Sequence, residues 1–304
     1  MSKLALLFPG QGSQFVGMGK ELFETSAAAR AVFEEADAAL GFSLSRLCFE
    51  GPEQELKRTA NTQPAILTHS VAAYRELQAR FPQRLEDVGF AAGHSLGEYS
   101  ANVAAGSLSF GDAVLLVRQR GLFMQEAVPA GAGAMAAIVG LTPEEVAAAC
   151  REAAQGEVVS PANFNSPDQT VIAGTAAAVA RASAACTARG ARRVIPLAVS
   201  APFHCALMAP ARERLRPLLE EARFADATVP VVTNVDARPE TRGSALRDAL
   251  ARQVDAPVRW VESVRALAAE GVDRGIEIGP GSVLSGLVRR IERGMKVEAY
   301  GGEV

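Results

Sequence analysis

Short apolar runs without polar alternation recur along this chain, and segments with a helical spacing of apolar residues follow them. The clearest runs cover residues 4–8, 88–92 and 275–278, and the clearest helical segments cover residues 18–40 and 63–80. Strands that are apolar on both faces and separated by helices are typical of a mainly parallel sheet covered by helices on each side. The pattern therefore predicts an α/β fold built on a large, mostly parallel sheet.

The order of predicted strands and helices changes between residues 130 and 199. This segment is predicted to contain, in order, a strand at 135–139, a helix at 142–154, strands at 158–163 and 169–173 joined by a turn at Asn165-Ser166-Pro167-Asp168, a helix at 175–189 and a strand at 193–199. The first helix begins with a capping-box sequence at Thr142, and Gly190 closes the second. A β-α-β-β-α-β order is that of a ferredoxin-like unit. We therefore predict a ferredoxin-like subdomain at residues 130–199, inserted into a larger α/β domain made of residues 1–129 and 200–304.

A G-x-S-x-G sequence, Gly93-His94-Ser95-Leu96-Gly97, follows the apolar run 88–92 and precedes a helical pattern of small residues. A strand, a tight turn and a helix in this order form a nucleophile elbow, which exposes a serine hydroxyl above the N-terminus of a helix. The glycines let the strand and the helix approach closely at the turn. Ser95 is therefore the candidate nucleophile, and the larger domain is predicted to be α/β-hydrolase-like.

A serine hydroxyl needs a general base, and the chain has 3 histidines. His94 adjoins Ser95 in the turn, so its side chain should point away from the serine hydroxyl. His69 lies in a helical pattern, where a structural role is favoured. His204 follows the last strand of the predicted subdomain, where the chain returns to the larger domain and a cleft is expected. By elimination, His204 is the predicted base.

The group that orients the imidazole of this base is open at this stage. Serine triads usually place an aspartate or a glutamate there, and Asp168 is the clearest loop candidate between Ser95 and His204, although its surroundings are typical of a turn. A neutral acceptor, such as a backbone or amide oxygen, is the alternative.

Two arginines, Arg118 and Arg120, lie in a further helical segment at residues 110–127. Residues two apart on a helix do not share a face, so one of the two should point to solvent. An arginine on a helix that lines an acyl pocket would bind a substrate carboxylate through two parallel hydrogen bonds. On spacing alone, however, a solvated surface side chain is the favoured interpretation of Arg120.

The net charge and the cysteines of the chain indicate which binding partners and which cellular compartment to expect. A net charge of −3 over 304 residues gives no sign of nucleic-acid binding. The first apolar run is too short for a signal sequence or a membrane span, so no membrane association is expected. The 4 cysteines are scattered without metal-site spacing, which is typical of free thiols in a reducing cytosol. These features predict a cytoplasmic enzyme.

Several short sequences together give the chain a specific resemblance to the malonyl-CoA:acyl carrier protein transacylases of bacterial type II fatty-acid synthesis. They occur in the family's order, cover nearly the whole chain, and are Phe8-Pro9-Gly10-Gln11-Gly12-Ser13-Gln14, Asn61-Thr62-Gln63-Pro64-Ala65, Gly93-His94-Ser95-Leu96-Gly97-Glu98, Arg120-Gly121 with Met124-Gln125, Ser200-Ala201-Pro202-Phe203-His204, Asn234-Val235-Asp236, Pro257-Val258-Arg259-Trp260 and Gly279-Pro280-Gly281. The inserted ferredoxin-like subdomain of that family agrees with the change in element order at residues 130–199. One departure is Ala256, where relatives often have asparagine.

The resemblance implies a role for the matching residues. Ser95 corresponds to the acylated serine, and His204 corresponds to its catalytic histidine. Arg120 corresponds to the arginine that pairs with the free carboxylate of malonate, which reverses the interpretation from spacing alone. Gln11 corresponds to the loop glutamine beside the oxyanion hole, and the backbone N–H of Leu96 is the other expected donor.

The resemblance extends to residues around this centre. Gln253 corresponds to the position whose main-chain oxygen orients the histidine, which would leave the site without a triad carboxylate. Phe203 should crowd a methyl branch and so favour malonyl over methylmalonyl groups. Gln63 and Asn165 are also expected to bind the substrate.

The implied reaction is ping-pong transfer of a malonyl group from malonyl-CoA, the donor substrate, to the phosphopantetheine thiol of an acyl carrier protein. No permanently bound cofactor or metal is expected, and the protein should be a monomer. Carrier proteins are acidic, so two groups of basic residues are candidate docking sites: Arg189, Arg192 and Arg193, and Arg289, Arg290 and Arg293. The alternatives are a malonyl transferase of polyketide synthesis and a serine-type acyl-thioester hydrolase.

Overall fold

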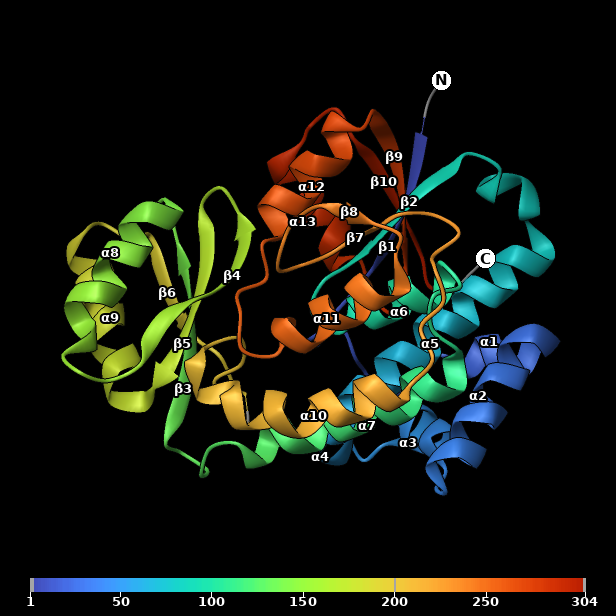
Figure 1. Cartoon of the computed structure of the whole chain (residues 1–304), viewed down its shortest axis with the longest axis horizontal. Helices are drawn as coiled ribbons and strands as arrows, with labels where there is room; N and C mark the ends of the chain where they lie inside the picture. The colour runs from blue at the N-terminus through green and yellow to red at the C-terminus, as the bar shows by residue number, and fades with distance from the viewer. Residues whose placement is uncertain (1–2, 200, 303–304) are drawn as a thin grey trace.

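Two β-sheets organise the chain in a computed structural model that describes residues 3–199 and 201–302 (Figure 1). The larger sheet has the strand order β10-β9-β1-β2-β7-β8, and the smaller sheet has the order β4-β5-β3-β6. The strands of the larger sheet are β1 (Lys3–Phe8), β2 (Val88–Gly93), β7 (Val231–Val232), β8 (Pro239–Glu240), β9 (Val272–Ile278) and β10 (Lys296–Tyr300). The predicted α/β fold class is confirmed.

Helices pack on both faces of the larger sheet. They are α1 (Lys20–Thr25), α2 (Ala27–Leu40), α3 (Leu44–Glu50), α4 (Glu53–Leu56), α5 (Thr59–Arg80), α6 (Gly97–Ala104), α7 (Phe110–Glu126), α10 (Ala209–Glu221), α11 (Gly243–Gln253), α12 (Trp260–Ala269) and α13 (Val283–Ile291), with short 3₁₀ helices at Pro82–Leu85 and Ala206–Met208. The segment of helical spacing predicted at residues 18–40 contains two helices, α1 and α2. Ser26 has an extended backbone between α1 and α2, and its hydroxyl accepts a hydrogen bond from the Ala29 N–H, so it ends one helix and caps the next.

The central strand β1 explains the apolar runs of the sequence. It lies between β2 and β9 and is parallel to both, whereas the short β8 at the sheet edge is antiparallel to β7. Leu4 and Phe8 enter the core on the side of α2, α5 and α7, and Ala5 and Leu7 enter the core on the side of α12 and α13. Because both faces of the strand are buried, it has no polar alternation.

The smaller sheet lies at one end of the molecule, with two helices on one of its faces (Figure 1). Its elements are β3 (Gly133–Val139), α8 (Pro143–Ala154), β4 (Val159–Ser166), β5 (Gln169–Thr175), α9 (Ala176–Ala188) and β6 (Arg193–Pro196). All strand pairings in it are antiparallel, and it shares a separate apolar core with α8 and α9. This is the β-α-β-β-α-β order predicted for a ferredoxin-like unit. The exact boundaries at residues 130 and 199 stay predictions.

The start of α8 agrees with the sequence-based prediction, whereas the turn between β4 and β5 differs from it. Thr142 and Glu145 form the predicted capping box at the start of α8. The turn between β4 and β5 is shorter than predicted, because Asn165 and Ser166 still belong to β4. That extension of the strand carries Asn165 toward the larger sheet.

Backbone hydrogen bonds join the smaller sheet to the segment that leads into α12. The Phe164 N–H donates to the Val258 oxygen over 2.9 Å, and the Val258 N–H donates to the Ala162 oxygen over 2.9 Å. Gly133 at the start of β3 is packed against Pro202, since a Cβ there would lie 2.4 Å from the proline ring. These contacts hold the smaller sheet beside the carboxyl ends of the parallel strands, where α/β folds place their binding sites.

We expect His69 of α5 to make the fold sensitive to acid. This side chain is only 3 % exposed, and burial lowers its pKa to about 4 from the ordinary histidine value of 6.5. The fold therefore favours neutral His69: its contribution to stability is complete above pH 6.5 and is lost as the pH falls from 6.5 to 4. The loss should be on the order of 3 kcal/mol.

The variant His69→Gln lacks this titration. Chemical denaturation between pH 4 and pH 7 should give a free energy of unfolding that falls less steeply with acid in the variant than in the wild type. The buried His94 and His204 are present in both proteins, so the difference between the two curves isolates His69. Parallel curves would contradict the prediction.

Candidate active site

Ser95 occupies the turn between β2 and α6. Its φ of 51° lies in the left-handed region, where a serine is strained. A Cβ on Gly97 would lie 2.0 Å from the Phe8 oxygen, and a Cβ on Gly93 would lie 2.0 Å from the Gly97 carbonyl group, so neither position has room for a side chain. The structure therefore contains the strand–turn–helix arrangement that the sequence predicts, with Ser95 lining a pocket.

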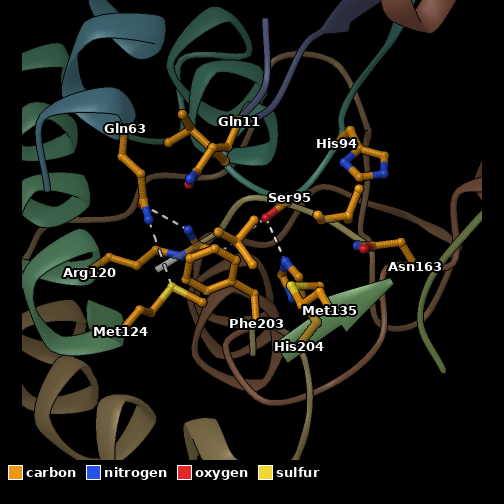
Figure 2. A pocket seen from close by; sticks show the side chains of 13 residues that line it. Gln11, Gln63, His94, Ser95, Arg120, Met124, Met135, Asn163, Phe203 and His204 are labelled. Carbon is orange, nitrogen blue, oxygen red and sulfur yellow. Dashed lines mark hydrogen bonds between the residues drawn. The ribbon is translucent and has the colours of Figure 1, made fainter. Parts of the chain in front are cut away.

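The Ser95 hydroxyl points at His204 (Figure 2). The distance from Ser95 Oγ to His204 Nε2 is 2.7 Å, and His204 Nδ1 lies 2.9 Å from the main-chain oxygen of Gln253. Since a carbonyl oxygen only accepts, Nδ1 carries the proton and Nε2 accepts from the serine hydroxyl. This is the tautomer in which a histidine can take a proton from a serine.

The orienting group that the sequence left open is thus a neutral oxygen. Asp168, the candidate carboxylate, lies instead at the turn between β4 and β5, where it pairs with Arg192 and accepts from the Ser166 hydroxyl. In the part of the chain that the structure describes, His204 has no carboxylate partner. The Ser95–His204 pair is a dyad held by the backbone at Gln253.

Burial keeps His204 uncharged. It is 4 % exposed, and its pKa is lowered to about 3, first by burial and second by the guanidinium of Arg120. The imidazole is therefore in its base form at neutral and weakly acidic pH. His204 also has a left-handed backbone, with a φ of 60°, so both members of the dyad are strained.

Arg120 extends from α7 into the same pocket (Figure 2). Its Nη1 donates to Gln63 Oε1 over 2.8 Å, and its Nη2 donates to Gln253 Oε1 over 2.9 Å and to Ser95 Oγ over 3.2 Å. The side chain is 2 % exposed, and its guanidinium lies 5.8 Å from the ring centre of Tyr99. Every one of these partners is neutral. Among the described residues no carboxylate forms a direct ion pair with Arg120, so its buried positive charge faces the pocket with neutral hydrogen-bond partners alone.

Arg118 contacts other residues than Arg120 and does not line the pocket in the described structure. It is partly buried, donates to the Ala60 oxygen and to Asn61, and lies over the ring of Phe42. The two arginines lie on different faces of α7, as the spacing predicts. Of the two, the pocket contains Arg120, so the interpretation of Arg120 as a solvated surface side chain is wrong.

The loop after β1 lies against the elbow and brings Gln11 to the pocket. A Cβ on Gly10 would lie 2.4 Å from the His94 oxygen, which shows how closely the loop approaches the turn. The Gln11 side-chain amide donates to Thr59 Oγ1 over 3.2 Å. In the described part of the chain, the backbone N–H groups of Gln11 and Leu96 make no hydrogen bond. Both residues line the pocket together with Ser95.

The pocket is lined from both sheets and from the segment between them. Its lining residues are Gln11, Gln63, His94, Ser95, Leu96, Arg120, Met124, Met135, Asn163, Leu197, Val199, Phe203 and His204. Phe203 lies in the wall of the pocket. Gln63 holds Arg120 and also lies 3.8 Å from the Met124 sulfur, so its position supports the guanidinium.

Asn165, which is predicted to bind the substrate, lies two residues after Asn163 on β4. It does not line the pocket of Ser95 in the described structure, where Asn163 takes that place. Its Oδ1 lies 2.8 Å from His94 Nε2, and it lines a second groove with the 9–13 loop and Leu284 of α13. This groove shares Gln11 and His94 with the pocket, so the two adjoin.

Sequence reasoning assigned no role to two buried polar residues beneath the elbow. Glu98 and Asn234 are both 0 % exposed and hydrogen bond to residues that contact Ser95. Both lie in the short sequences that carry the family resemblance. The signal was thus present, but only the tertiary contacts reveal what these side chains touch.

The two predicted basic clusters differ in their surroundings. Arg189 pairs with Glu152 and Arg192 pairs with Asp168, so the first cluster is largely neutralised. Arg289 and the other two arginines of the second cluster are exposed at and beyond the end of α13. The docking surface stays a prediction. Across the described residues, none of the helices has the length and apolar character that crossing a membrane requires.

The histidine is placed to activate the strained serine as a nucleophile, and the buried arginine faces the same pocket. This arrangement is that of an acyl-transfer enzyme. The chain belongs to the acyl transferase domain family, whose model matches residues 5–302.

Named relatives place it more closely within that family. The chain is 55 % identical over 291 residues to the malonyl CoA-acyl carrier protein transacylase of Escherichia coli (strain K12), covering 96 % of this chain and 93 % of the relative. A crystal structure of an acyl carrier protein S-malonyltransferase from Vibrio cholerae is 51 % identical, with a TM-score of 0.94 over 98 % of this chain and 96 % of that one. A malonyl-transacylase in complex with a type II polyketide synthase acyl-carrier protein is 49 % identical, with a TM-score of 0.96 over 99 % and 97 % of the two chains.

We expect a sulfonyl fluoride, which sulfonylates activated serines, to label Ser95 with little dependence on acid. Because the pKa of His204 is lowered to about 3, the labelling rate between pH 6.5 and pH 5 should change by less than about twofold. A base with an ordinary histidine pKa would slow labelling about 15-fold over this range.

Mass spectrometry of the labelled protein checks both the site and the rate. The variant His204→Ala should react about 100-fold more slowly, since general-base catalysis is lost. A rate that falls in the wild type with an inflection near pH 6.5 would contradict the neutral-base interpretation.

Proposed function

We propose that this chain transfers a malonyl group from malonyl-CoA to the phosphopantetheine thiol of an acyl carrier protein, through a malonyl ester of Ser95. The observation that carries the proposal is the buried Arg120 guanidinium, whose Nη2 lies 3.2 Å from Ser95 Oγ and whose partners are all neutral. A buried cation beside the nucleophile favours an acyl group that brings its own negative charge. The relatives named for malonyl transfer support the same conclusion.

In the first half-reaction Ser95 Oγ attacks the thioester carbonyl carbon of malonyl-CoA. His204 Nε2 takes the hydroxyl proton, and the Gln253 main-chain oxygen, 2.9 Å from Nδ1, stabilises the imidazolium that forms. When the tetrahedral intermediate collapses, the carbon–sulfur bond breaks and His204 returns the proton to the departing CoA sulfur. The product is malonyl-Ser95 with neutral His204.

The negative oxygen of the tetrahedral intermediate needs hydrogen-bond donors that are already in place. We assign this role to the backbone N–H groups of Gln11 and Leu96, two residues that line the pocket with Ser95 and whose N–H groups make no hydrogen bond in the described structure. Removing one such donor typically costs about 3 kcal/mol of transition-state stabilisation. The close packing of Gly10 against the elbow keeps these donors in position.

The second half-reaction reverses these steps with a different thiol. The phosphopantetheine thiol gives its proton to His204 as its sulfur attacks the ester carbon, and Ser95 leaves with that proton. The groove beside Asn165 and α13 adjoins the pocket, and we assign it to the pantetheine arm of either thiol. Malonyl-CoA and the carrier then use the same site in turn, without a resident cofactor.

Two side chains set the choice of acyl group. Arg120 favours malonyl over acetyl, because an uncharged acyl group would leave the buried guanidinium unpaired. Phe203 is buried in the pocket wall, where its ring takes up space that a methyl branch on the acyl group would need. Excluding one methyl group contributes only about 1–3 kcal/mol, so selection against methylmalonyl should be weaker than selection for the carboxylate.

We also propose the cellular compartment, the pathway and the oligomeric state of the protein. Each of the four cysteines is free and buried, as expected in a reducing cytoplasm. We assign the protein to fatty-acid synthesis and to the monomeric state. A polyketide carrier is the second candidate acceptor, because one neighbouring structure pairs a malonyl-transacylase with such a carrier.

The test follows the malonyl group through both half-reactions. The protein is mixed with malonyl-CoA, the mass increment on Ser95 is measured, and a phosphopantetheinylated carrier of fatty-acid or polyketide type is added. We expect the label to move from Ser95 to the carrier thiol, and faster to the fatty-acid carrier. Release of the label as free malonate, with the carrier unmodified, would show a hydrolase and overturn the proposal.

The variant Arg120→Ala should lose malonyl transfer selectively. We expect kcat/KM for malonyl-CoA to fall by at least about 100-fold, because the substrate carboxylate loses a buried charged partner. Acetyl-CoA, which has no such carboxylate, should be affected far less or accepted better than by the wild type. Equal losses with both donors, measured as acylation of Ser95, would rule out the carboxylate contact.

A further inference from the structure

A buried acid, Glu98, lies beneath the turn that carries Ser95. It belongs to the first turn of α6 and is 0 % exposed. Its Oε2 accepts two hydrogen bonds, from Gln253 Nε2 over 2.7 Å and from the Asn234 N–H over 3.1 Å. Its Oε1 is buried and has no hydrogen-bond partner in the described part of the chain. None of the steps derived above uses this side chain.

Both donors to Glu98 belong to residues that hold the backbone of Ser95. Asn234 Oδ1 accepts from the Ser95 N–H over 2.7 Å, and Asn234 Nδ2 donates to the Gly93 oxygen over 2.7 Å. Gln253 Nε2 donates to the Ser95 oxygen over 2.8 Å. The two polar backbone groups of the strained serine are thus bound by the side chains of Asn234 and Gln253. Both residues also donate to one carboxylate oxygen of Glu98, Asn234 through its backbone N–H and Gln253 through its side-chain amide.

Gln253 connects the same acceptor to the other reacting groups. Its Oε1 accepts from Arg120 Nη2 over 2.9 Å, and its main-chain oxygen lies 2.9 Å from His204 Nδ1. The hydrogen bond from Gln253 Nε2 to Glu98 therefore fixes which end of the amide faces Arg120. A displaced Gln253 would misplace the guanidinium and loosen the contact with the dyad.

We propose that Glu98 is a positioning residue for acylation: its Oε2 ties α6 to Asn234 and Gln253 and so holds Ser95, Arg120 and His204 in the reactive arrangement. It touches neither the substrate nor the reacting atoms. The inference rests on the proposed malonyl transfer, since the rate of that acylation is what it explains.

The role needs an acceptor oxygen and not a permanent charge. Burial raises the pKa of Glu98 to about 7, so the side chain is present both as acid and as carboxylate near neutral pH. The charged groups that act on it are Arg120 of α7 and Asp236 after β7. Oε2 can accept in either form, with the proton of the acid on Oε1. A glutamine at this position would keep the acceptor and lose only the charge.

The experiment compares two variants of nearly equal size, Glu98→Gln and Glu98→Met. Single-turnover acylation of Ser95 by saturating malonyl-CoA is measured by mass spectrometry in each. Glu98→Met removes the acceptor, and we expect its rate to fall by about 100-fold, the effect of a displacement of roughly 1 Å in a reactive geometry. Glu98→Gln should stay within about tenfold of the wild type, because it loses charge assistance only.

The matched control is Glu76→Met in α5. Glu76 is also 0 % exposed and bonds to Arg80 and Tyr300, away from the pocket. Its loss should lower the unfolding temperature while the acylation rate stays near that of the wild type. An equal fall in the acylation rate of the control would show a general effect of losing a buried acid and would overturn the proposal.

The outcomes separate the inference from the proposed function. If the wild type forms no malonyl-Ser95, the proposed function fails. If the wild type reacts and Glu98→Met reacts as fast, or Glu98→Gln is as slow as Glu98→Met, the positioning role is overturned. Should Glu98→Met fail to fold, Glu98→Asp keeps a carboxylate but withdraws it from Gln253 and Asn234 by one CH2 group, and it is judged by the same rates: a fall of about 100-fold supports the proposal and a wild-type rate overturns it.

Discussion

The hydrogen bonds of Gln253 at the end of α11 are the interaction on which the geometry of the site depends. Its main-chain oxygen fixes the tautomer of His204, its side-chain oxygen holds Arg120, and its amide nitrogen holds the backbone of Ser95. One residue therefore sets the base, the charged anchor and the nucleophile relative to one another. Because it is fully buried, these bonds do not compete with water.

Burial also explains why this site suits an anionic acyl group. The same exclusion of water that keeps His204 neutral leaves the charge of Arg120 without solvation, and the nearby positive charge further lowers the histidine pKa. A carboxylate beside the histidine would raise its pKa and would also compete for the arginine. A main-chain oxygen orients the imidazole without adding charge, so the pocket stays positive until a substrate carboxylate enters.

The fold assembles the pocket by bringing segments that are far apart in the sequence to one edge of the larger sheet. β1 and β2 end beside each other, which places the Gln11 loop against the Ser95 elbow. The smaller sheet is attached through β4 to residue Val258 and covers this edge, contributing Met135 and Asn163 to the pocket wall. The strain at Ser95 and His204 is maintained by packing and hydrogen bonds that both sheets anchor.

The sequence alone determined the class of fold, the order of elements in the smaller sheet and the identity of the candidate nucleophile, because these depend on local periodicity and on glycines at one turn. It could not place the ends of α1 and α2. Local pattern also left Asp168 and a neutral oxygen open as the partner of His204, and only the family resemblance pointed to the main-chain oxygen of Gln253. Only tertiary structure decided that Arg120 is buried among neutral hydrogen-bond partners and that Glu98 and Gln253 meet beneath Ser95. Those facts depend on contacts between residues more than a hundred positions apart, and hydrophobic periodicity carries no information about such contacts.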